Sequence, residues 1–500
     1  MTAHAIMVLG TTSGAGKSWL TTALCRWYAR QGLRVAPFKA QNMSNNARVV
    51  PGPDGRLGEI GSAQYFQALA ARAQPDVRMN PVLLKPEQDT ASQVVVMGDV
   101  RDDLRRVPWR DRSEHLWPYA RAGLMSLMAD HDVVVIEGAG SPAEINLHSS
   151  DYVNMRTAMA ARAACLLVTD IDRGGAFAHL YGTHQLLPPE ERALIRGFVL
   201  NRFRGDPALL APGPEQLHAL TGVPTVAVLP MWRGHGLPEE DGVFDDAPTG
   251  PVGADMSSGA VILRVAVVAY PRISNLDEFQ PLRSAPNVRL TWARHPSELD
   301  DVDWIILPGS KHTTSDLNWL RANHLDSAIH RHVQLGRPVL GICGGLQMLG
   351  RTLTDVDGVE GIAGNEVAGL GLLDVQTCFD AHKLLAVTSA HFGSEMASSA
   401  WRALANTPVQ GYEIHHGRTE ACSANAHPIL KHADGHQLGW LQGSVLGVYL
   451  HGLFEDHRAL HALLGQDAPS LNQVFDGLAD YVDAHFSPAT LSALLGAPVA

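Results

Sequence analysis

Short apolar runs that end in glycine or an acidic residue alternate with longer segments of helical periodicity through most of this sequence. Runs that are apolar at every position are typical of parallel strands buried on both faces. Five of them lie in the first half: AIMVLG (5–10), DVVVIEG (132–138), CLLVTD (165–170), GFVLN (197–201) and TVAVLP (225–230). The segment between the first two has apolar residues at helical spacing, at Trp19, Leu20, Ala23, Leu24, Trp27 and Tyr28. The alternation predicts an α/β fold, with helices on both faces of a doubly wound parallel sheet.

The pattern breaks between residues 244 and 260, where glycine, proline, serine and aspartate are frequent. Such a composition is typical of a domain boundary. A second α/β series follows, with ILRVAVVAY (262–270), WIILPGS (304–310), PVLGICGG (338–345) and LGVYLHG (446–452). We therefore predict a first domain over residues 1–245, a linker over 246–260 and a second domain over 261–455. The helical pattern from about Glu455 predicts an extension over 456–500 that covers the second domain.

A glycine-rich loop, GTTSGAGKS (10–18), lies between a predicted strand and a predicted helix. Glycine lets the backbone turn its N–H groups toward a phosphate, and the start of the helix adds positive potential. In loops of this kind the lysine reaches the β- and γ-phosphates and the hydroxyl after it holds Mg²⁺. The spacing departs from the usual motif because Thr11 occupies the first glycine position. The residues predicted to contact the nucleotide are Gly10, Thr11, Thr12, Gly14, Gly16, Lys17 and Ser18.

A nucleotide bound with Mg²⁺ also needs carboxylates near the ends of the strands. Glu137 ends the strand-like run DVVVIE and is the first candidate. Asp54 and Glu59 lie in the loop-rich stretch PGPDGRLGEIG. Asp170 and Asp172 follow another strand and are weaker candidates. The predicted metal ligands are therefore Ser18, Glu137, Glu59 and Asp54.

The second half contains GICGGLQML (341–349), in which small residues flank Cys343 between a predicted strand and a predicted helix. A sharp turn of this kind exposes the sulfur at a helix N-terminus, where the thiolate is favoured. The backbone N–H groups of Gly344 and of Gly309, in the loop after a neighbouring strand, are predicted to stabilise an oxyanion. His451, at the end of the last strand-like run, is the predicted base. Together these residues predict a cysteine nucleophile.

Charge and cysteine content restrict the class of protein. The chain carries 39 Lys and Arg residues against 51 Asp and Glu residues, a formal charge of −12, which argues against general nucleic-acid binding. The five cysteines form no C-x-x-C pair, so neither a disulfide framework nor a cysteine zinc site is indicated. The first residues run directly into the glycine-rich loop, and no apolar run approaches the roughly 18 residues of a membrane span. We therefore predict a cytoplasmic protein with no nucleic-acid and no membrane partner.

Taken together, these segments resemble the cobyric acid synthase family, the glutamine-hydrolysing amidotransferases of cobalamin biosynthesis. The resemblance covers nearly the whole chain. It includes the phosphate loop and the cysteine turn, which many other proteins share. PFKAQNMSNN (37–46) and EGAGSPAEINL (137–147) are more specific to the family. Further matching segments are MNPVLLKP (79–86), DIDRGGAFA (from 170), NRFRGD (201–206), YPRISNLDEF (270–279), LPGSKHT (307–313) and GYEIHHG (411–417).

The resemblance implies a first domain like dethiobiotin synthetase and a second domain like the class I glutamine amidotransferases. It implies that ATP and Mg²⁺ drive the amidation of adenosylcobyrinic acid a,c-diamide at its b, d, e and g carboxylates, which gives adenosylcobyric acid. L-glutamine would be the nitrogen donor. Cys343 matches the nucleophile of the family and His451 matches its catalytic histidine. Lys39 and Lys85, in segments that carry the resemblance, are predicted contacts for phosphate or a substrate carboxylate.

One position departs from the wider amidotransferase pattern. Class I glutaminases usually carry a glutamate two residues after the histidine, but here that position is Leu453, as in the cobalamin branch. Glu413 and Glu455 are candidates for the group that orients His451. Three alternatives stay open: cobyrinic acid a,c-diamide synthase, which shares both domains, a P-loop ATPase that switches partners, and a regulatory module with an inactive glutaminase. A homo-oligomer also stays open.

Overall fold

The chain folds into two compact units. The computed structural model describes residues 3–88, 91–105, 107–238, 263–361, 363–432, 434–466 and 469–496. Unit 1 contains residues 1–44, 50–237 and 470–500, and unit 2 contains residues 45–49 and 238–469. The predicted linker over residues 246–260 lies outside the described residues.

Unit 1 is built on a parallel six-stranded sheet in the order β12-β11-β10-β1-β9-β2. All five strands predicted in the first half are present in it. Alternate residues of a strand face opposite sides of a sheet, so Ile6 and Val8 pack into one apolar cluster, whereas Met7 and Leu9 pack into another. The sheet strands are β1 (His4–Gly10), β2 (Val35–Phe38), β9 (Val133–Glu137), β10 (Ala164–Asp170), β11 (Ile195–Phe203) and β12 (Thr225–Pro230).

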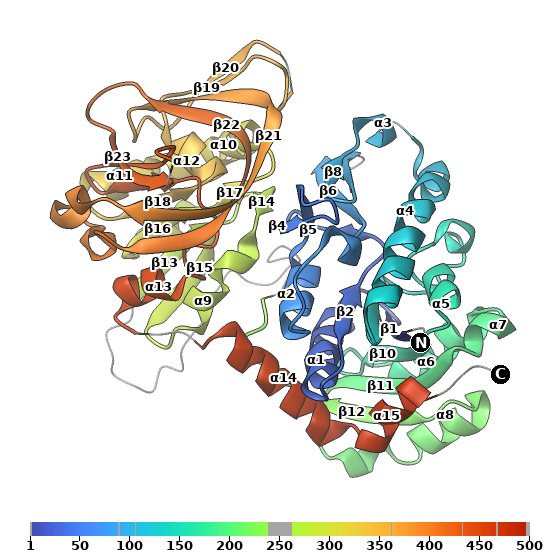
Figure 1. Ribbon diagram of the computed structural model, residues 1–500. Helices are drawn as coiled ribbons and strands as arrows, with labels where there is room; N and C mark the ends of the chain where they lie inside the picture. Colours follow the sequence, from blue (N-terminus) through green and yellow to red (C-terminus); the bar gives the residue numbers. More distant parts are fainter. Residues whose placement is uncertain are drawn as a thin grey trace. The chain divides into compact units, whose positions relative to one another are not determined.

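Helices cover both faces of this sheet (Figure 1), which confirms the predicted α/β class. One face carries α1 (Lys17–Arg30) and α2 (Ser62–Ala70). The other carries α4 (Trp109–Asp130), α5 (Met155–Ala161), α6 (Ala176–Leu186) and α8 (Gly213–Thr221). A second, small sheet contains β3 (Asn42–Met43), β6 (Val82–Gln88), β7 (Ala91–Val96) and β8 (Asp99–Val100). The remaining elements are β5 (Leu57–Gly61), α3 (Asp102–Arg105) and α7 (Pro189–Arg192).

The last two helices, α14 (Leu471–His485) and α15 (Pro488–Gly496), belong to unit 1. In Figure 1 they lie beside α1 and the lower strands of the sheet. Phe475 and Leu478 of α14 join the apolar cluster of α1, and Arg26 Nε donates to Asp476 Oδ1 over 2.8 Å. The prediction that the residues after Glu455 cover the second domain is therefore wrong for these helices, because their buried apolar side chains lie in the same cluster as those of α1. The helix before them, α13 (His457–Leu464), packs in unit 2.

Unit 2 is built on a mixed sheet of 11 strands. Its parallel part, in the order β15-β13-β16-β18-β25, contains the four strands predicted in the second half. These strands are β13 (Leu263–Val268), β15 (Val288–Ala293), β16 (Trp304–Leu307), β18 (Val339–Ile342) and β25 (Val445–Val448). Helices α10 (Thr313–Ala322), α11 (Leu325–Gln334) and α12 (Gly344–Leu349) pack near this part.

The rest of the large sheet is mostly antiparallel and was not predicted. Strand β21 alternates between buried and exposed residues at both ends, and β22 buries Glu413 and His415 at its centre, so neither has the continuous apolar run of a buried parallel strand. The strands are β19 (Thr352–Asp355), β20 (Asn365–Ala368), β21 (Val375–Phe392), β22 (Pro408–Ala421), β23 (His427–His432) and β24 (Gln437–Gln442). A separate pair joins β14 (Ile273–Ser274) to β17 (Gly309–Ser310), and α9 (Gln280–Ser284) follows β14.

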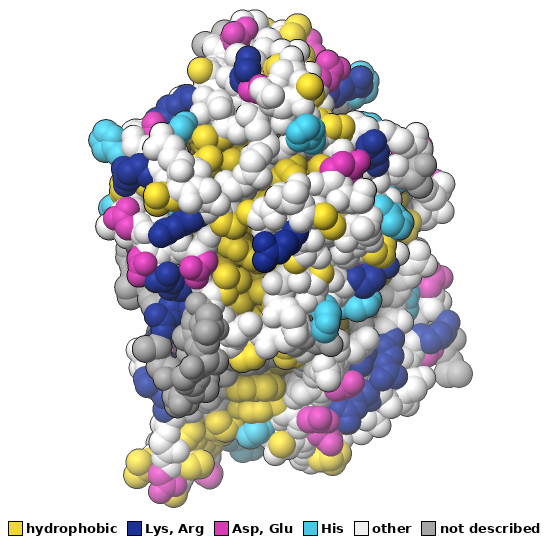
Figure 2. Space-filling model, turned by 90° about the vertical axis from the view of Figure 1, so that its left-hand side faces the viewer, with side chains coloured by type: hydrophobic (Ala, Val, Ile, Leu, Met, Phe, Trp, Pro, Cys, Tyr) yellow, Lys and Arg dark blue, Asp and Glu magenta, His cyan; other side chains and the backbone are white. Residues whose placement is uncertain are grey.

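Unit 2 also takes in five residues from the N-terminal part of the chain, 45–49, where β4 (Ala47–Pro51) begins. On the face that Figure 2 shows, the described Lys and Arg side chains are interspersed with Asp and Glu, and no extended basic surface is seen. Among the described residues, no helix is both long enough and apolar enough to span a bilayer.

Candidate active sites

The phosphate loop of unit 1 connects the end of β1 to the start of α1. Gly14 and Gly16 have φ angles of 70° and 102°, in the left-handed region that favours glycine. Lys17 Nζ donates to the carbonyl oxygens of Thr12 and Gly140 over 3.0 and 3.1 Å. These contacts hold the lysine amino group inside the curve of the loop, where a phosphate-binding loop needs its positive charge.

The first residues of the loop explain its departure from the usual motif. Gly10 lies directly under the lysine, because a Cβ atom built on it would be 2.9 Å from Lys17 Nζ. Thr11 stands where the motif has glycine, and its hydroxyl lies 2.9 Å from the Thr169 hydroxyl at the end of β10. The side chain at this position therefore anchors the loop to the neighbouring strand.

Glu137, at the end of β9, is the centre of a buried polar cluster beside the loop. Its Oε1 accepts hydrogen bonds from Ser18 Oγ over 2.9 Å and Lys39 Nζ over 2.8 Å, and its Oε2 accepts one from Gln67 Nε2 over 2.5 Å. Burial raises the pKa of Glu137, but the Lys39 charge and these hydrogen bonds outweigh burial and lower it below its ordinary value. Glu137 is therefore ionised, as a metal ligand must be.

The other predicted carboxylates have different surroundings. Glu59 is fully buried in an ion pair with Lys85. Asp54 lies on an exposed turn, where Arg56 Nε donates to its Oδ2 over 2.6 Å. The structure thus brings together Ser18 and Glu137, whereas it gives Asp54 and Glu59 partners of their own.

The weaker candidates, Asp170 and Asp172, follow β10. Each of them forms an ion pair with an arginine. Arg202 Nη1 donates to Asp170 Oδ2 over 2.9 Å, and Arg204 Nε donates to Asp172 Oδ1 over 2.7 Å. These ion pairs give both carboxylates a structural partner.

The donor atoms of Ser18 and Glu137 fit Mg²⁺. A hydroxyl and a carboxylate are hard oxygen ligands, and this ion takes its remaining ligands from waters and substrate phosphates. Among the described residues no group of three or more His, Cys, Asp or Glu side chains could hold a metal ion, so a site built only from protein is not found there. Lys39 donates to the same Glu137 oxygen as Ser18, and a cation bound there would compete with it.

Cys343 lies at the sharp turn between β18 and α12 in unit 2. Its φ and ψ angles are 50° and −106°, a conformation that residues with side chains rarely adopt. The turn is held because Cys343 N donates to the Val448 carbonyl of β25 over 2.8 Å. Gly345 packs so closely on Leu307 that any side chain there would collide with the backbone. The spacing of small residues around the cysteine is thus a packing requirement of the turn.

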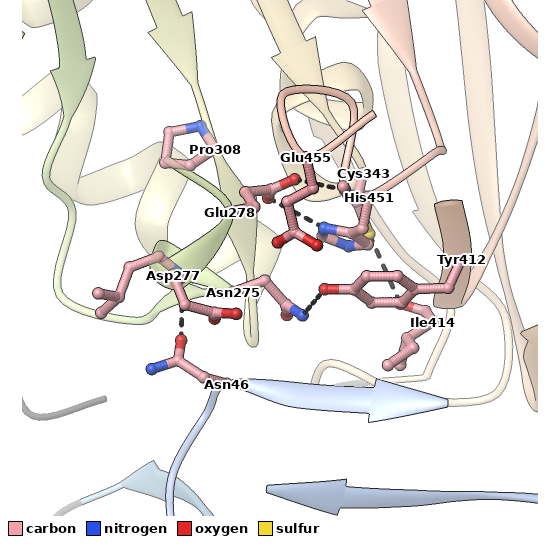
Figure 3. A network of polar contacts seen from close by, with 12 residues as sticks. Asn46, Asn275, Asp277, Glu278, Pro308, Cys343, Tyr412, Ile414, His451 and Glu455 are labelled. Atoms are coloured by element: carbon pink, nitrogen blue, oxygen red, sulfur yellow. Dashed lines mark hydrogen bonds and ion pairs between the residues drawn. The ribbon is translucent and has the colours of Figure 1, made fainter. Parts of the chain in front are cut away.

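His451 lies beside Cys343, and Glu278 orients it (Figure 3). The imidazole Nδ1 is 3.1 Å from Glu278 Oε1, and the Gly452 N–H donates to Glu278 Oε2 over 3.0 Å. The Tyr412 ring stacks on the imidazole, with the ring centres 5.3 Å apart and an angle of 18° between the ring planes. Burial lowers the pKa of His451, but the charges of Glu278 and Cys343 and their hydrogen bonds raise it to about 10. The histidine is therefore an imidazolium at neutral pH.

The expectation that Glu413 or Glu455 orients His451 is wrong. Glu413 accepts a hydrogen bond from Thr388 Oγ1 over 2.7 Å and lies 3.2 Å from His415 Nε2. Glu455 binds an arginine. Glu278 was missed because it lies in a short 3₁₀ helix after β14, far from His451 in the sequence. Its one signal was its place in YPRISNLDEF, a segment that carries the family resemblance.

The two glycines predicted as oxyanion donors both adjoin the cysteine–histidine pair. Gly344 follows Cys343 and begins α12, and a Cβ atom on it would lie 2.8 Å from the backbone nitrogen of Ser310. Gly309 begins β17, and a Cβ atom on it would lie 2.9 Å from His451 Cε1. Their role as donors stays a prediction, and their location suits it.

Two protein-family models match most of the chain. The CobQ/CobB/MinD/ParA nucleotide binding domain matches residues 6–233, and the CobB/CobQ-like glutamine amidotransferase domain matches residues 264–459. The first contains the phosphate loop and Glu137. The second contains Cys343, Glu278 and His451.

Curated relatives match the chain over almost its full length. Cobyric acid synthase of Methylibium petroleiphilum is 67% identical over 99% of this chain and 97% of its own. The cobyric acid synthase of Leptothrix cholodnii is 67% identical over 99% of this chain and 97% of its own length. That of Variovorax paradoxus is 63% identical over 99% of this chain and 100% of its own length. Together with the two matched domains, this identity shows that the chain belongs to the cobyric acid synthase family of CobB/CobQ-like glutamine amidotransferases.

Proposed function

We propose that this chain uses ATP and glutamine to amidate the b, d, e and g carboxylates of adenosylcobyrinic acid a,c-diamide, which gives adenosylcobyric acid. The observation that carries the proposal is the presence, in one chain, of the Cys343–His451–Glu278 arrangement and of a phosphate loop with Lys17 and Glu137. The full-length identity to curated cobyric acid synthases supports the choice of substrate.

Ammonia is released in unit 2. The Cys343 thiolate attacks the side-chain amide carbon of glutamine, and the oxyanion that forms accepts hydrogen bonds from the Gly344 and Gly309 N–H groups. The His451 imidazolium gives its proton to the departing nitrogen, so ammonia leaves and a thioester remains. His451, now neutral, takes a proton from the water that hydrolyses the thioester, and glutamate is released.

The carboxylate is activated in unit 1. A free carboxylate does not react with ammonia because its oxygen is a poor leaving group. Transfer of the γ-phosphoryl group of ATP to the carboxylate gives an acyl phosphate and ADP, and ammonia then displaces phosphate to form the amide. Lys17 and the loop N–H groups stabilise the charge on the transferred group. Ser18 and Glu137 would hold Mg²⁺, which when bound neutralises phosphate charge.

Product analysis tests the proposal. The purified protein is incubated with ATP, Mg²⁺ and glutamine and either adenosylcobyrinic acid a,c-diamide or cobyrinic acid, and the product masses are recorded. We expect four successive amidations of the diamide, each replacing a hydroxyl by an amino group. Amidation of cobyrinic acid that stops at the a,c-diamide would instead identify a cobyrinic acid a,c-diamide synthase.

A further inference from the structure

Arg48 comes from the N-terminal part of the chain but is a buried member of unit 2. Only 1% of the residue is exposed. Its guanidinium forms a fork with Glu455, with Nη1 donating to Oε2 over 2.8 Å and Nη2 to Oε1 over 2.6 Å, and Nη2 also binds Asp277. The guanidinium carbon lies 4.8 Å from the centre of the Tyr412 ring. Arg48 therefore joins three segments of unit 2 at one point.

Each of these three segments also holds His451. Asp277 is the neighbour of Glu278, which binds the imidazole. Tyr412 stacks on the imidazole, and its carbonyl accepts the His451 N–H over 2.9 Å. Glu455 N donates to the carbonyl of Gly452, the residue after the histidine, over 3.0 Å. A shift of Arg48 would thus displace three segments that all contact His451 or the residue next to it.

The segment around Arg48 is itself fixed by hydrogen bonds to the same loop. Asn46 Oδ1 accepts a hydrogen bond from Leu276 N over 3.0 Å. Asn275 Nδ2 donates to the Ala47 carbonyl and to the Tyr412 hydroxyl, both over 2.7 Å. These contacts place the segment against the glutaminase centre independently of the Arg48 charge.

We propose that Arg48 is a positioning residue of the glutaminase: it fixes the Asp277–Glu278 turn and Tyr412 in the arrangement that orients His451. The inference rests on the proposed function. It also means that the glutaminase centre is built from both halves of the sequence, since residues 45–49 lie between two stretches of unit 1.

The charge of Arg48 matters as well as its shape. The groups that face Arg48 or His451 are Asp277, Glu278, Tyr412, Glu455 and Cys343. Burial raises the pKa of Glu455, while the Arg48 charge holds it down. Because the Arg48 charge lowers the pKa of Glu455 and of Tyr412, loss of this buried cation favours the protonated form of both groups. The pH profile of glutamine hydrolysis should therefore respond to the charge at position 48.

The test compares Arg48→Met with Arg48→Lys in the full-length protein. Glutamate release is measured across pH without corrinoid, so the result does not depend on whether amidation occurs. We expect kcat of Arg48→Met to fall by about 100-fold, the scale of a small misplacement at a reaction centre, with KM for glutamine little changed. Both limbs of its pH profile should move to higher pH. Arg48→Lys should recover part of kcat with unmoved limbs, because it keeps the charge but loses the fork.

The control is Arg351→Met, which removes an arginine bound to Asp374 in the same unit and should leave glutamate release unchanged. Wild-type kcat in Arg48→Met would overturn the proposal. So would an equal loss in both Arg48 variants with no movement of the pH limbs, since that pattern marks a merely structural role. If Arg48→Met does not fold, Arg48→Lys decides: a reduced kcat with unchanged KM for glutamine, in a variant that unfolds at the wild-type temperature, supports the proposal, and an unchanged kcat overturns it.

Discussion

At the scale of single residues, the glutaminase depends on how one buried carboxylate sets the state of one histidine. Glu278 is fully buried and binds both the imidazole Nδ1 and the N–H of the next residue, Gly452. It therefore fixes the ring orientation and stabilises the positive charge on the ring, as the carboxylate of a catalytic triad does. Class I glutaminases usually place this carboxylate two residues after the histidine, where this chain has Leu453. Here Glu278, from a different segment, takes that part.

Glu278→Gln tests this role. We expect kcat for glutamate release to fall by about 10³- to 10⁴-fold, the scale seen when the carboxylate beside a catalytic histidine is neutralised. Activity needs protonated His451 and is lost as pH rises through the His451 pKa, which is about 10. Loss of the Glu278 charge lowers this pKa, so the alkaline limb of the pH profile should move to lower pH. Glu413→Gln is the control, and its alkaline limb should stay in place because Glu413 binds His415. An unmoved limb in Glu278→Gln would show that another group sets the charge of His451.

At the scale of elements, the short pairing of β14 with β17 places Gly309, a predicted oxyanion donor, beside His451. Gly309 pairs with Ser274, and a Cβ atom on Gly309 would lie 2.6 Å from Ser274 Oγ and 2.9 Å from His451 Cε1. No real Cβ atom tolerates such contacts, so either the strand or the ring must move. These contacts, and not the backbone conformation, require glycine at this position, because the φ angle of Gly309 is not in the left-handed region.

Gly309→Ala should therefore lower kcat for glutamate release by about 100-fold, through displacement of the ring and of the donor. Amidation supported by high ammonia should persist, because unit 1 carries out that step. Gly182→Ala in α6 is the matched control, since a Cβ atom there meets nothing within 4 Å. Wild-type glutaminase activity in Gly309→Ala would mean that the strand yields without effect on the reaction centre.

Elements differ in how well they could be predicted. Strands such as β1 and β9 are buried on both faces, so their sequences are continuously apolar and identify them. The antiparallel strand β21 alternates buried and exposed residues at both ends, and β22 includes polar residues in its buried centre, so neither sequence is continuously apolar. The position of α14 could not be predicted, because an apolar stripe shows that a helix packs but not on which sheet.

At the scale of the whole molecule, the two half-reactions should separate by mutation. Cys343→Ala should abolish glutamine-dependent amidation but keep amidation with high ammonia, since only the nitrogen source is lost. Lys17→Met should abolish amidation from both sources, because neither can replace the acyl phosphate. Product formation is measured with each nitrogen source. Equal failure of Cys343→Ala with both sources, or ammonia-dependent product from Lys17→Met, would contradict this division.

The same division shows what the sequence revealed about the sites. Cys343 and the phosphate loop were found because each lies in a local motif whose spacing has a physical reason. Glu137 and His451 were found because strand ends meet at one edge of a parallel sheet. Glu278 and Arg48 could not be found in this way, since each reaches the histidine only through contacts between distant segments.

The passage of residues 45–49 into unit 2, and of residues 470–500 back into unit 1, has a genetic consequence. Neither unit is encoded by one uninterrupted stretch of the gene. A single break at any codon would leave one product short of part of its own fold, either the strip that carries Arg48 or the terminal helix pair. Splitting this enzyme into two exchangeable subunits would thus require rerouting the polypeptide.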